Sequence, residues 1–236
     1  MRPLAHAPSG ALASSANAIL LGLAPCDLRM LEPMDYVRLP ARYALYAAGD
    51  ALRCLYFPAS AVASFVQADE RGAMLETAHV GAEGVIGVTA LLGAERARQR
   101  AVVRIAGGAY RVPLSAARSA FARSATFQAA ILRFAEALIL QLSQNVICKL
   151  THTVEQQFCR RLLLYADRVP GAELEMTHEQ MAEALGLRRQ GITEAARRLQ
   201  ARQAIAYSRG RISVLDHAAV ARHACECYGV VRSAYA

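Results

Sequence analysis

The spacing of apolar residues divides the chain into stretches of different texture. Between residues 35 and 113, short apolar runs alternate with Gly, Pro and Asp, which predicts short strands, and Asp69–Gly72 predicts a hairpin turn. From residue 126, apolar positions recur at helical spacing. After Pro170-Gly171 a compact helical segment follows, with apolar alternation near 204–215. The pattern therefore predicts a β-roll, barrel or sandwich, then a long helix and a second small domain.

Apolar positions in the long helix fall on two faces. One line steps alternately by three and four residues, which is the repeat that packs two helices together. A second line runs through Ile131, Phe134, Leu138 and Ile147. A helix that is apolar on two sides must be covered on two sides, so we expect one face on the β domain and the other on a second copy. The alternative is a buried helix in a monomer. The expected dimer contacts are Leu132, Ala135, Ile139, Leu142 and Val146.

The segment that starts at Thr177 has the features of a helix-turn-helix. Thr177 and Gln180 form a capping box that begins one helix, and Gly186 ends it in the left-handed conformation. A second helix is predicted from about Arg188 to Gln203. The face expected to pack on the first helix consists of Ile192, Ala195, Ala196 and Leu199. Two short helices joined by such a turn form a helix-turn-helix.

The opposite face of the second helix is polar and basic. Arg and Gln hydrogen-bond base edges, and Arg also pairs with phosphate. A hairpin around Arg209-Gly210 follows, and a last helix is predicted near 216–227. Gly191 costs about 1 kcal/mol relative to Ala in a helix, which we interpret as room for a backbone or phosphate to approach. The residues expected to contact DNA are Thr177, Arg188, Arg189, Gln190, Thr193, Glu194, Arg197, Arg209 and Arg211.

The total charge of the chain says little about DNA binding, but the position of the charges along the sequence does. The 236-residue chain has a formal net charge of +8, but Lys149 is its only lysine, so abundant Arg is weak evidence for phosphate recognition. Residues 186–211 contain seven Arg and one acid, a net charge of +6, which leaves +2 for the rest of the chain. This concentration, unlike the total, indicates an interface with nucleic acid.

The segment MTHEQMAEALGLRRQGITEAARRLQARQAIAYSRGRISVLD resembles the winged helix of the Crp/Fnr superfamily of bacterial transcription regulators. The resemblance covers nearly the full chain and implies an α+β fold. Its expected parts are a cyclic-nucleotide-binding-like β-roll over 1–125, a dimerisation helix over 126–153 and a winged helix-turn-helix over 154–236.

The resemblance also implies a function. It indicates a homodimeric, sequence-specific regulator that binds palindromic double-stranded DNA through the major groove, with RNA polymerase as a further partner. It assigns Arg189, Gln190 and Glu194 to the three principal base-reading positions, where the family commonly has Arg, Glu and Arg. Those differences imply a different operator.

The ligand site of the roll departs from the family pattern. That pattern has a Gly-Glu pair whose Glu binds the ribose, and an Arg for the cyclic phosphate. Here Val88 stands where the Glu belongs, and either Arg98 or Gln99 falls at the Arg. Since Val would leave the ribose hydroxyls unpaired, we expect a non-standard ligand or none. A cAMP- or cGMP-gated regulator with an altered pocket is the alternative. The candidate pocket residues are Gly87, Val88, Arg98, Gln99 and Arg100.

The remaining residues suggest no further chemistry. His223, Cys225 and Cys227 group together, but no fourth zinc ligand is evident, and cysteines two apart on a helix point apart. No nucleophile–base pair or phosphate-binding glycine-rich loop is present. We therefore expect no metal, no cofactor and no enzymatic activity. The effector is unidentified, and a non-DNA-binding interaction protein built on the roll is a further alternative.

Cysteine usage and hydropathy address localisation. Six scattered cysteines without a C-x-x-C pair suggest a reducing cytoplasm. The apolar run Ala18–Leu23 is short for a signal peptide. Arg133, Glu136 and Lys149 interrupt the apolar region Ala129–Leu150, so we expect no membrane span there.

Overall fold

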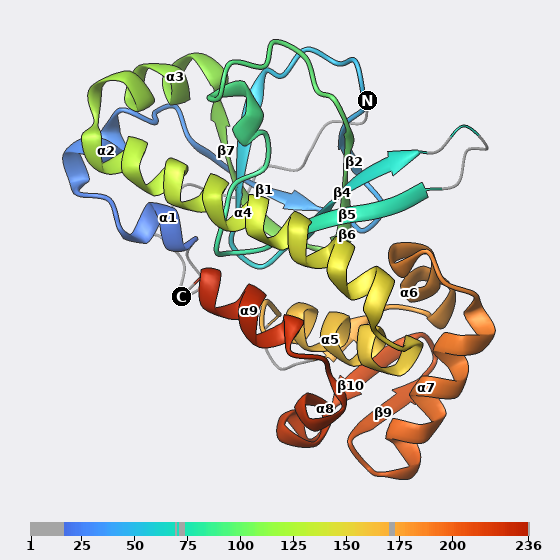
Figure 1. The fold of residues 1–236 in the computed structure, drawn as a ribbon. Coiled ribbons are helices and arrows are strands. Elements are labelled where there is room, and N and C mark those ends of the chain that lie inside the picture. Colours follow the sequence, from blue (N-terminus) through green and yellow to red (C-terminus); the bar gives the residue numbers. More distant parts are fainter. Residues whose placement is uncertain (1–16, 69, 71–73, 170–172, 236) are drawn as a thin grey trace. The chain divides into compact units, whose positions relative to one another are not determined.

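The computed structural model describes residues 17–68, 70, 74–169 and 173–235, which form two compact units (Figure 1). The first unit is Met1–Phe65 with His79–Glu136, and the second is Val66–Ala78 with Ala137–Ala236. The predicted turn at Asp69–Gly72, apart from Glu70, and the predicted break at Pro170-Gly171 lie outside the described residues.

The strands of the roll form two sheets, as the alternation of short apolar runs and turns predicts. One is the antiparallel sheet β1-β7-β3, and the other has the order β2-β6-β4-β5. Leu55, Phe57 and Val112 are fully buried where β3 and β7 pair. The strands are β1 Asp35–Leu39, β2 Ala44–Tyr46, β3 Cys54–Pro58, β4 Val62–Ala68, β5 Met74–Val80, β6 Arg100–Ile105 and β7 Gly107–Pro113.

Short helices flank these strands. Pro25 is the first residue of a helix, a position that needs no backbone N–H. The helices are α1 Ala18–Leu21, α2 Pro25–Arg29, the 3-10 turn η1 Val88–Ala90 and α3 Leu114–Arg123.

Helix α4, Ala125–Thr151, contributes residues to both units. Its predicted inner face is buried at Ile131, Phe134 and Leu138. A side chain at Gly84 would collide with the Phe134 ring, so this glycine permits the helix to approach the loop after β5. One of the two predicted apolar faces of the helix is thus buried in the protein core.

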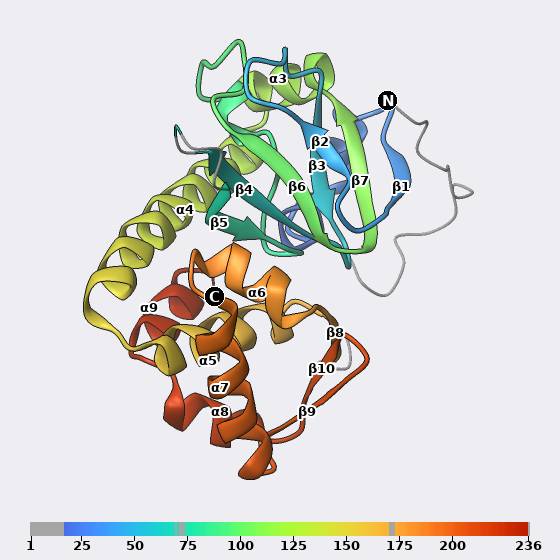
Figure 2. The ribbon, with the colours of Figure 1, turned by 90° about the vertical axis from the view of Figure 1, so that its right-hand side faces the viewer.

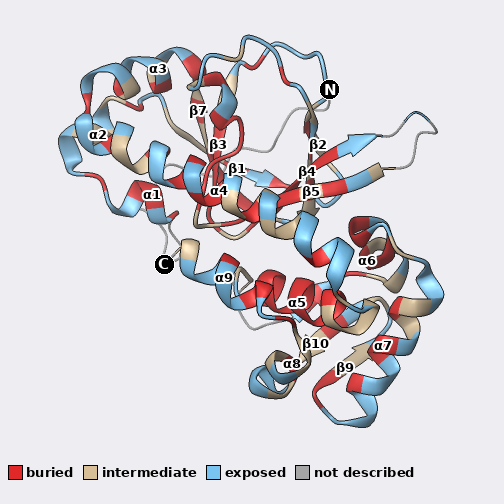
Figure 3. Cartoon of the chain, viewed as in Figure 1, coloured by how far each residue is buried: buried red, intermediate tan, exposed pale blue. Residues whose placement is uncertain are grey.

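Part of the surface of α4 is exposed (Figure 3). It includes an apolar stripe, in which Leu132, Ile139 and Val146 are 49%, 62% and 60% exposed. Two details differ from the sequence prediction. Ala135, expected in the stripe, is 7% exposed, whereas Ile147, expected on the inner face, is 48% exposed. Ala135 lies at the border between the two faces, only about 40° around the helix from Ile131, whereas Ile147 lies about 160° from Ile131 and so falls on the opposite side of the helix.

Helix α4 also bears on the expectation that the chain has no membrane span in this region. By length and composition it could cross a membrane, contrary to the conclusion drawn from its charges, although 39% of its most apolar window is buried. A single helix of this kind is weak evidence for a span, because core helices of water-soluble proteins share the same composition.

The second unit is built around helix α5, whose residues Phe158, Leu162 and Leu163 are fully buried. Thr153 caps α5 and pairs with Gln156 in a capping box. The elements are α5 Val154–Ala166, β8 Glu173–Glu175, α6 His178–Leu185, α7 Arg189–Ala201, β9 Ile205–Ser208, β10 Arg211–Val214, α8 His217–His223 and α9 Cys227–Ala234. Strand β8 and helix α9 were not predicted, and the helix expected near 216–227 ends at His223.

A buried ion pair ties the end of the β4–β5 hairpin to α5. Glu76 and Arg161 are 4% and 3% exposed and form a salt bridge, and the Tyr165 hydroxyl donates to Glu76 Oε2 at 2.7 Å. The Arg161 guanidinium also lies 5.7 Å from the centre of the Tyr165 ring. Burial lowers the pKa of Arg161. A carboxylate beside it is therefore needed to keep this charge inside the protein.

We expect Glu76→Leu to lower the free energy of unfolding by about 3–5 kcal/mol, because it leaves the Arg161 charge buried without its partner. Urea unfolding followed by circular dichroism measures this change. The double variant Glu76→Leu/Arg161→Met is the control, and it should recover most of the loss because no buried charge remains. Equal losses in the single and the double variant would show that packing, and not the ion pair, determines stability here.

Candidate nucleic-acid interface

Helices α6 and α7 form the predicted helix-turn-helix, and the local signals that predicted it are present (Figure 2). The Thr177 side chain accepts from Gln180 N at 3.2 Å, and Thr177 N donates to Gln180 Oε1 at 2.8 Å. Gly186 adopts the left-handed conformation with φ 57°. Arg188 precedes α7 and makes no side-chain capping bond.

Helix α7 separates an apolar face from a polar one. Its inner residues are at most 3% exposed: Ile192, Ala195, Ala196 and Leu199. On the outer face Arg189, Gln190, Glu194 and Arg197 are exposed, and Thr193 is half-buried. The inner residues fix the rotation of the helix, so the outer ones form one continuous surface.

Two of the expected base-reading residues bind each other. Gln190 Nε2 donates to Glu194 Oε1 at 3.0 Å, one helical turn away. The Glu194 carboxylate thereby orients the Gln190 amide, and its second oxygen is left to accept from another donor. Sequence reasoning assigned the two positions separately and did not foresee this pair.

Sequence reasoning missed His178, which connects α6, α7 and the hairpin. Its Nδ1 lies 3.3 Å from Thr193 Oγ1, and its ring stacks on the Tyr207 ring with centroids 3.9 Å apart. Burial, followed by the charges of Arg189 and Arg197, lowers the pKa of His178, so the ring is neutral at pH 7. Only the tertiary fold brings these residues together.

The wing is a two-residue hairpin with β9 and β10 paired antiparallel. Arg209 and Gly210 have φ 50° and 79°, and two positive values are what a type I′ turn requires. Arg209 is exposed at this turn. A Cβ on Gly210 would lie 3.4 Å from Thr177 Cγ2, so the wing turn lies against the start of α6.

Strand β8 changes the expected role of Arg211. Because β8 pairs with β10, its two acids flank this arginine, with Arg211 3.2 Å from Glu173 Oε1 and 3.1 Å from Glu175 Oε1. Counted from residue 173, the segment to 211 has seven Arg and five Glu, a net charge of +2 in place of +6. The concentration of charge is therefore weaker evidence than the placement of individual arginines.

The other arginines fall into two groups. Arg198 and Arg202 bind Glu155 at 3.0 and 2.9 Å, and they lower its pKa although burial opposes this. Arg189 lies 3.6 Å from Glu179 with both side chains exposed, which is a weak pair. Arg188, Arg197 and Arg209 form no ion pair within the described part of the chain.

Gly191 serves an internal contact. A Cβ on Gly191 would lie 3.2 Å from Val154 Cγ1, so the glycine lets α7 pack closely on α5. This contact is a reason within the protein for a glycine at this position, and the approach of a backbone or phosphate stays a prediction.

The five predicted pocket residues do not line the open cavity of about 410 Å³ found in the roll, whose walls include Tyr46, Arg53 and Arg111. Gly87 has φ 93° and precedes η1, and Val88 is 2% exposed. Arg98 and Arg100 are exposed and Gln99 is half-buried. Val88 is thus a packing residue, with no polar atom to offer a ligand.

Comparison with known proteins agrees with this geometry. Residues 156–222 match the model of the Crp-like helix-turn-helix domain. FixK2 from Bradyrhizobium japonicum superposes with TM-score 0.68 and 14% identity over 81% of this chain and 98% of that one. The c-di-GMP responsive global regulator CLP from Xanthomonas campestris has TM-score 0.63 and 16% identity over 81% and 99%. A CRP-family transcriptional regulator from Thermus thermophilus has TM-score 0.63 and 20% identity over 79% and 95%.

No curated protein sequence matches the chain closely enough to count as a relative. The chain therefore carries a Crp-like helix-turn-helix domain and has the fold of Crp/Fnr-type DNA-binding transcription regulators, as the resemblance predicted.

The lowered pKa of His178 predicts a pH effect on stability. The unfolded state binds this proton more readily than the folded state, so the free energy of unfolding falls as the pH drops below about 6.5. We expect the variant His178→Gln to have a flatter pH profile. Urea midpoints of both proteins between about pH 5 and 8 measure the difference. Parallel profiles would contradict the assignment, and an NMR titration of the ring gives the pKa directly.

Proposed function

We propose that this chain is a homodimeric, sequence-specific transcription regulator that inserts α7 into the major groove of palindromic DNA. The observation that carries the proposal is the exposed row Arg189, Gln190, Glu194 and Arg197, which lies opposite the buried face of α7 in a Crp-like domain. Such a helix presents its first turns to base edges while the flanking elements contact the phosphate backbone.

Individual roles follow from charge and pairing. Arg189, Gln190 and Glu194 read bases, because their side chains are exposed on the first turns of α7. Arg188, Arg197 and Arg209 contact phosphates, and Thr177 and Thr193 support the surface through the cap and through His178. Arg211 contributes to DNA contact only if it leaves Glu173 and Glu175.

The exposed stripe on α4 is the proposed dimer contact. Leu132, Ile139 and Val146 repeat every seven residues and are exposed, and half-buried Leu142 lies between the last two. Two copies related by a two-fold axis would present two α7 helices to two half-sites, which is why a palindrome is expected. Ala135 contributes little to such a contact because it is already buried.

The proposed domains are the roll over 1–125, the dimerisation helix over 126–153 and the DNA-binding domain over 154–236. A cytoplasmic location and contact with RNA polymerase belong to the same proposal and rest on the likeness in fold. A regulatory role without enzymatic activity is favoured because the matched domain is a helix-turn-helix.

The roll is proposed to take a non-standard ligand or none. Buried Val88 supports this, because no carboxylate stands where the family binds ribose. Gating by a cyclic nucleotide is the second candidate, favoured by the open cavity in the roll and by the description of CLP as responsive to c-di-GMP. Calorimetry with cAMP, cGMP and c-di-GMP separates the two, since the first proposal predicts no heat with cAMP or cGMP even at millimolar concentration.

We expect Arg189→Ala to weaken operator binding by about 1–3 kcal/mol and to relax preference at one base pair. Arg209→Ala should weaken binding to all sequences alike and reduce the salt dependence by about one phosphate contact. Selection from random DNA, followed by fluorescence anisotropy at several salt concentrations, measures both effects. Arg202→Ala is the matched control, because Arg202 is paired with Glu155.

An unchanged base preference in Arg189→Ala would exclude Arg189 as a base-reading residue. If the wild-type chain bound no DNA even at low salt, the proposal would fail and the interaction-protein alternative would replace it.

We expect Ile139→Arg to separate the dimer, because it places a charge in the centre of the proposed apolar contact. Analytical ultracentrifugation should show monomers, and affinity for a palindrome should fall to that for a single half-site. Leu92→Arg is the control, since Leu92 is a 49% exposed leucine outside α4. A dimer that persists in Ile139→Arg would place the subunit contact elsewhere.

A further inference from the structure

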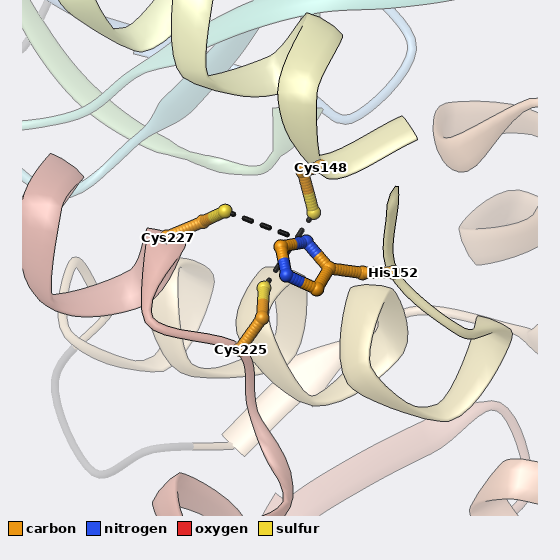
Figure 4. Close-up of side chains that lie close together, drawn as sticks. All are labelled: Cys148, His152, Cys225 and Cys227. Carbon is orange, nitrogen blue, oxygen red and sulfur yellow. Dashed lines mark hydrogen bonds between the residues drawn. The ribbon is translucent and has the colours of Figure 1, made fainter. Parts of the chain in front are cut away.

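Four metal-binding side chains meet in the second unit (Figure 4). Cys148 lies near the end of α4 and His152 directly follows that helix, whereas Cys225 lies between α8 and α9 and Cys227 is the first residue of α9. Their ligand atoms all lie within 4.8 Å of one another. The three cysteines are at most 4% exposed. Three thiols and an imidazole thus share one buried centre, drawn from two distant parts of the chain.

Two features of the sequence argued against a metal site, and the structure removes both objections. The fourth ligand exists, because Cys148 and His152, four residues apart, lie on one side of the end of α4. Cys225 lies outside any helix and Cys227 begins α9, so helical spacing does not separate them. His223, which the sequence grouped with these cysteines, instead lies 3.7 Å from Glu155.

The distances fit a single tetrahedral ion. Zinc binds Cys sulfur at about 2.3 Å and His nitrogen at about 2.0–2.1 Å, so tetrahedral ligands lie about 3.8 Å apart for two sulfurs and about 3.6 Å apart for sulfur and nitrogen. The Sγ atoms of Cys148 and Cys225 are 3.6 Å apart, as are Cys227 Sγ and His152 Nδ1. A cluster of several irons would need its ligands spread more widely.

The groups around the centre are those that support a metal site. His152 Nε2, the nitrogen directed away from Cys227, lies 3.1 Å from Glu226 Oε1. A carboxylate on the second nitrogen orients the ring and makes the first a better ligand. Gln144 Nε2 donates to Cys227 Sγ at 3.0 Å, a bond that favours the thiolate.

A buried cation balances the charge of the centre. Three thiolates and a neutral imidazole around a divalent ion have a net charge of −1. Arg160 is 2% exposed, lines the same pocket as Cys148, and its Nε finds no hydrogen-bond partner among the described residues. A negatively charged site beside it would explain why this guanidinium is buried.

We propose that Cys148, His152, Cys225 and Cys227 bind one zinc ion in a closed tetrahedral site. Tetrahedral sulfur-rich sites select zinc among the common divalent ions, and four protein ligands leave no open position for catalysis. Binding releases the thiol protons and links the end of α4 to the α8–α9 segment. The site shares no residue with the proposed DNA-contact surface, and the inference does not depend on the proposed function.

The test uses the full chain purified with a non-thiol reductant and without chelator. We expect about one zinc per chain by mass spectrometry of the metal content. Replacement by cobalt should give thiolate-to-cobalt charge-transfer bands in the near ultraviolet and intense visible bands typical of tetrahedral cobalt. A strong chelator should lower the melting temperature. None of these measurements needs a variant that folds.

Variants locate the ion. Cys225→Ser should lose most of the bound zinc, whereas Cys159→Ala should keep it, because Cys159 is a buried cysteine outside the group. Glu226→Gln should retain the cobalt bands but bind metal about 10–100-fold more weakly.

Three results would overturn the proposal. The first is a wild-type protein that neither retains zinc nor shows the cobalt bands. The second is undiminished zinc in Cys225→Ser, which would put the metal elsewhere. The third is a Cys148–Cys225 disulfide in the purified protein under reducing conditions, which would make these cysteines a redox pair.

Discussion

The second unit depends on how it accommodates two adjacent buried cations, Arg160 and Arg161. Removing charge from water costs several kcal/mol per ion unless partners replace the solvent. Glu76 forms a salt bridge with Arg161 and accepts from the Tyr165 hydroxyl, and Asn145 accepts from Arg160 Nη2 at 2.7 Å. Asn145 in turn donates to Thr77 O at 2.6 Å. These contacts join the β4–β5 hairpin, the end of α4 and α5, so the base on which α6 and α7 pack is defined by charge as much as by apolar burial.

Much of this fold could be predicted because its signals are local. The Thr177 capping box, the left-handed Gly186 and the buried face of α7 each depend on residues within one or two helical turns, and all three are present. The α4 pattern likewise separated a buried side from an exposed one. Ala135 was misassigned because it lies where the two faces meet, whereas Ile147 was grouped with residues that lie about 140–180° away around the helix, and its exposure agrees with helical periodicity.

What could not be predicted depends on contacts distant in sequence. Strand β8 is three residues long and has no alternation of its own, yet it brings two acids to Arg211. His178 meets Tyr207 only because the wing folds back on α6. The fourth ligand near Cys225 lies about seventy residues earlier, where the sequence shows only an apolar helix that contains a cysteine and precedes a histidine. A single sequence cannot show which of these distant residues come into contact, because each contact depends on the tertiary fold.

The hydrogen bond between Gln190 and Glu194 bears on how operators of this protein could diverge. A free Gln side chain can both donate to and accept from adenine. A Gln whose amide N–H is bound to a carboxylate has one donor fewer for a base. The carboxylate itself accepts from donors such as the cytosine amino group. Under the proposed function, the two residues would therefore act as one reading unit, and preferences at the corresponding base pairs would be interdependent. A regulon recognised through such a pair would change its operator by coordinated substitution at both positions, because either single change leaves the other side chain without the partner that orients it.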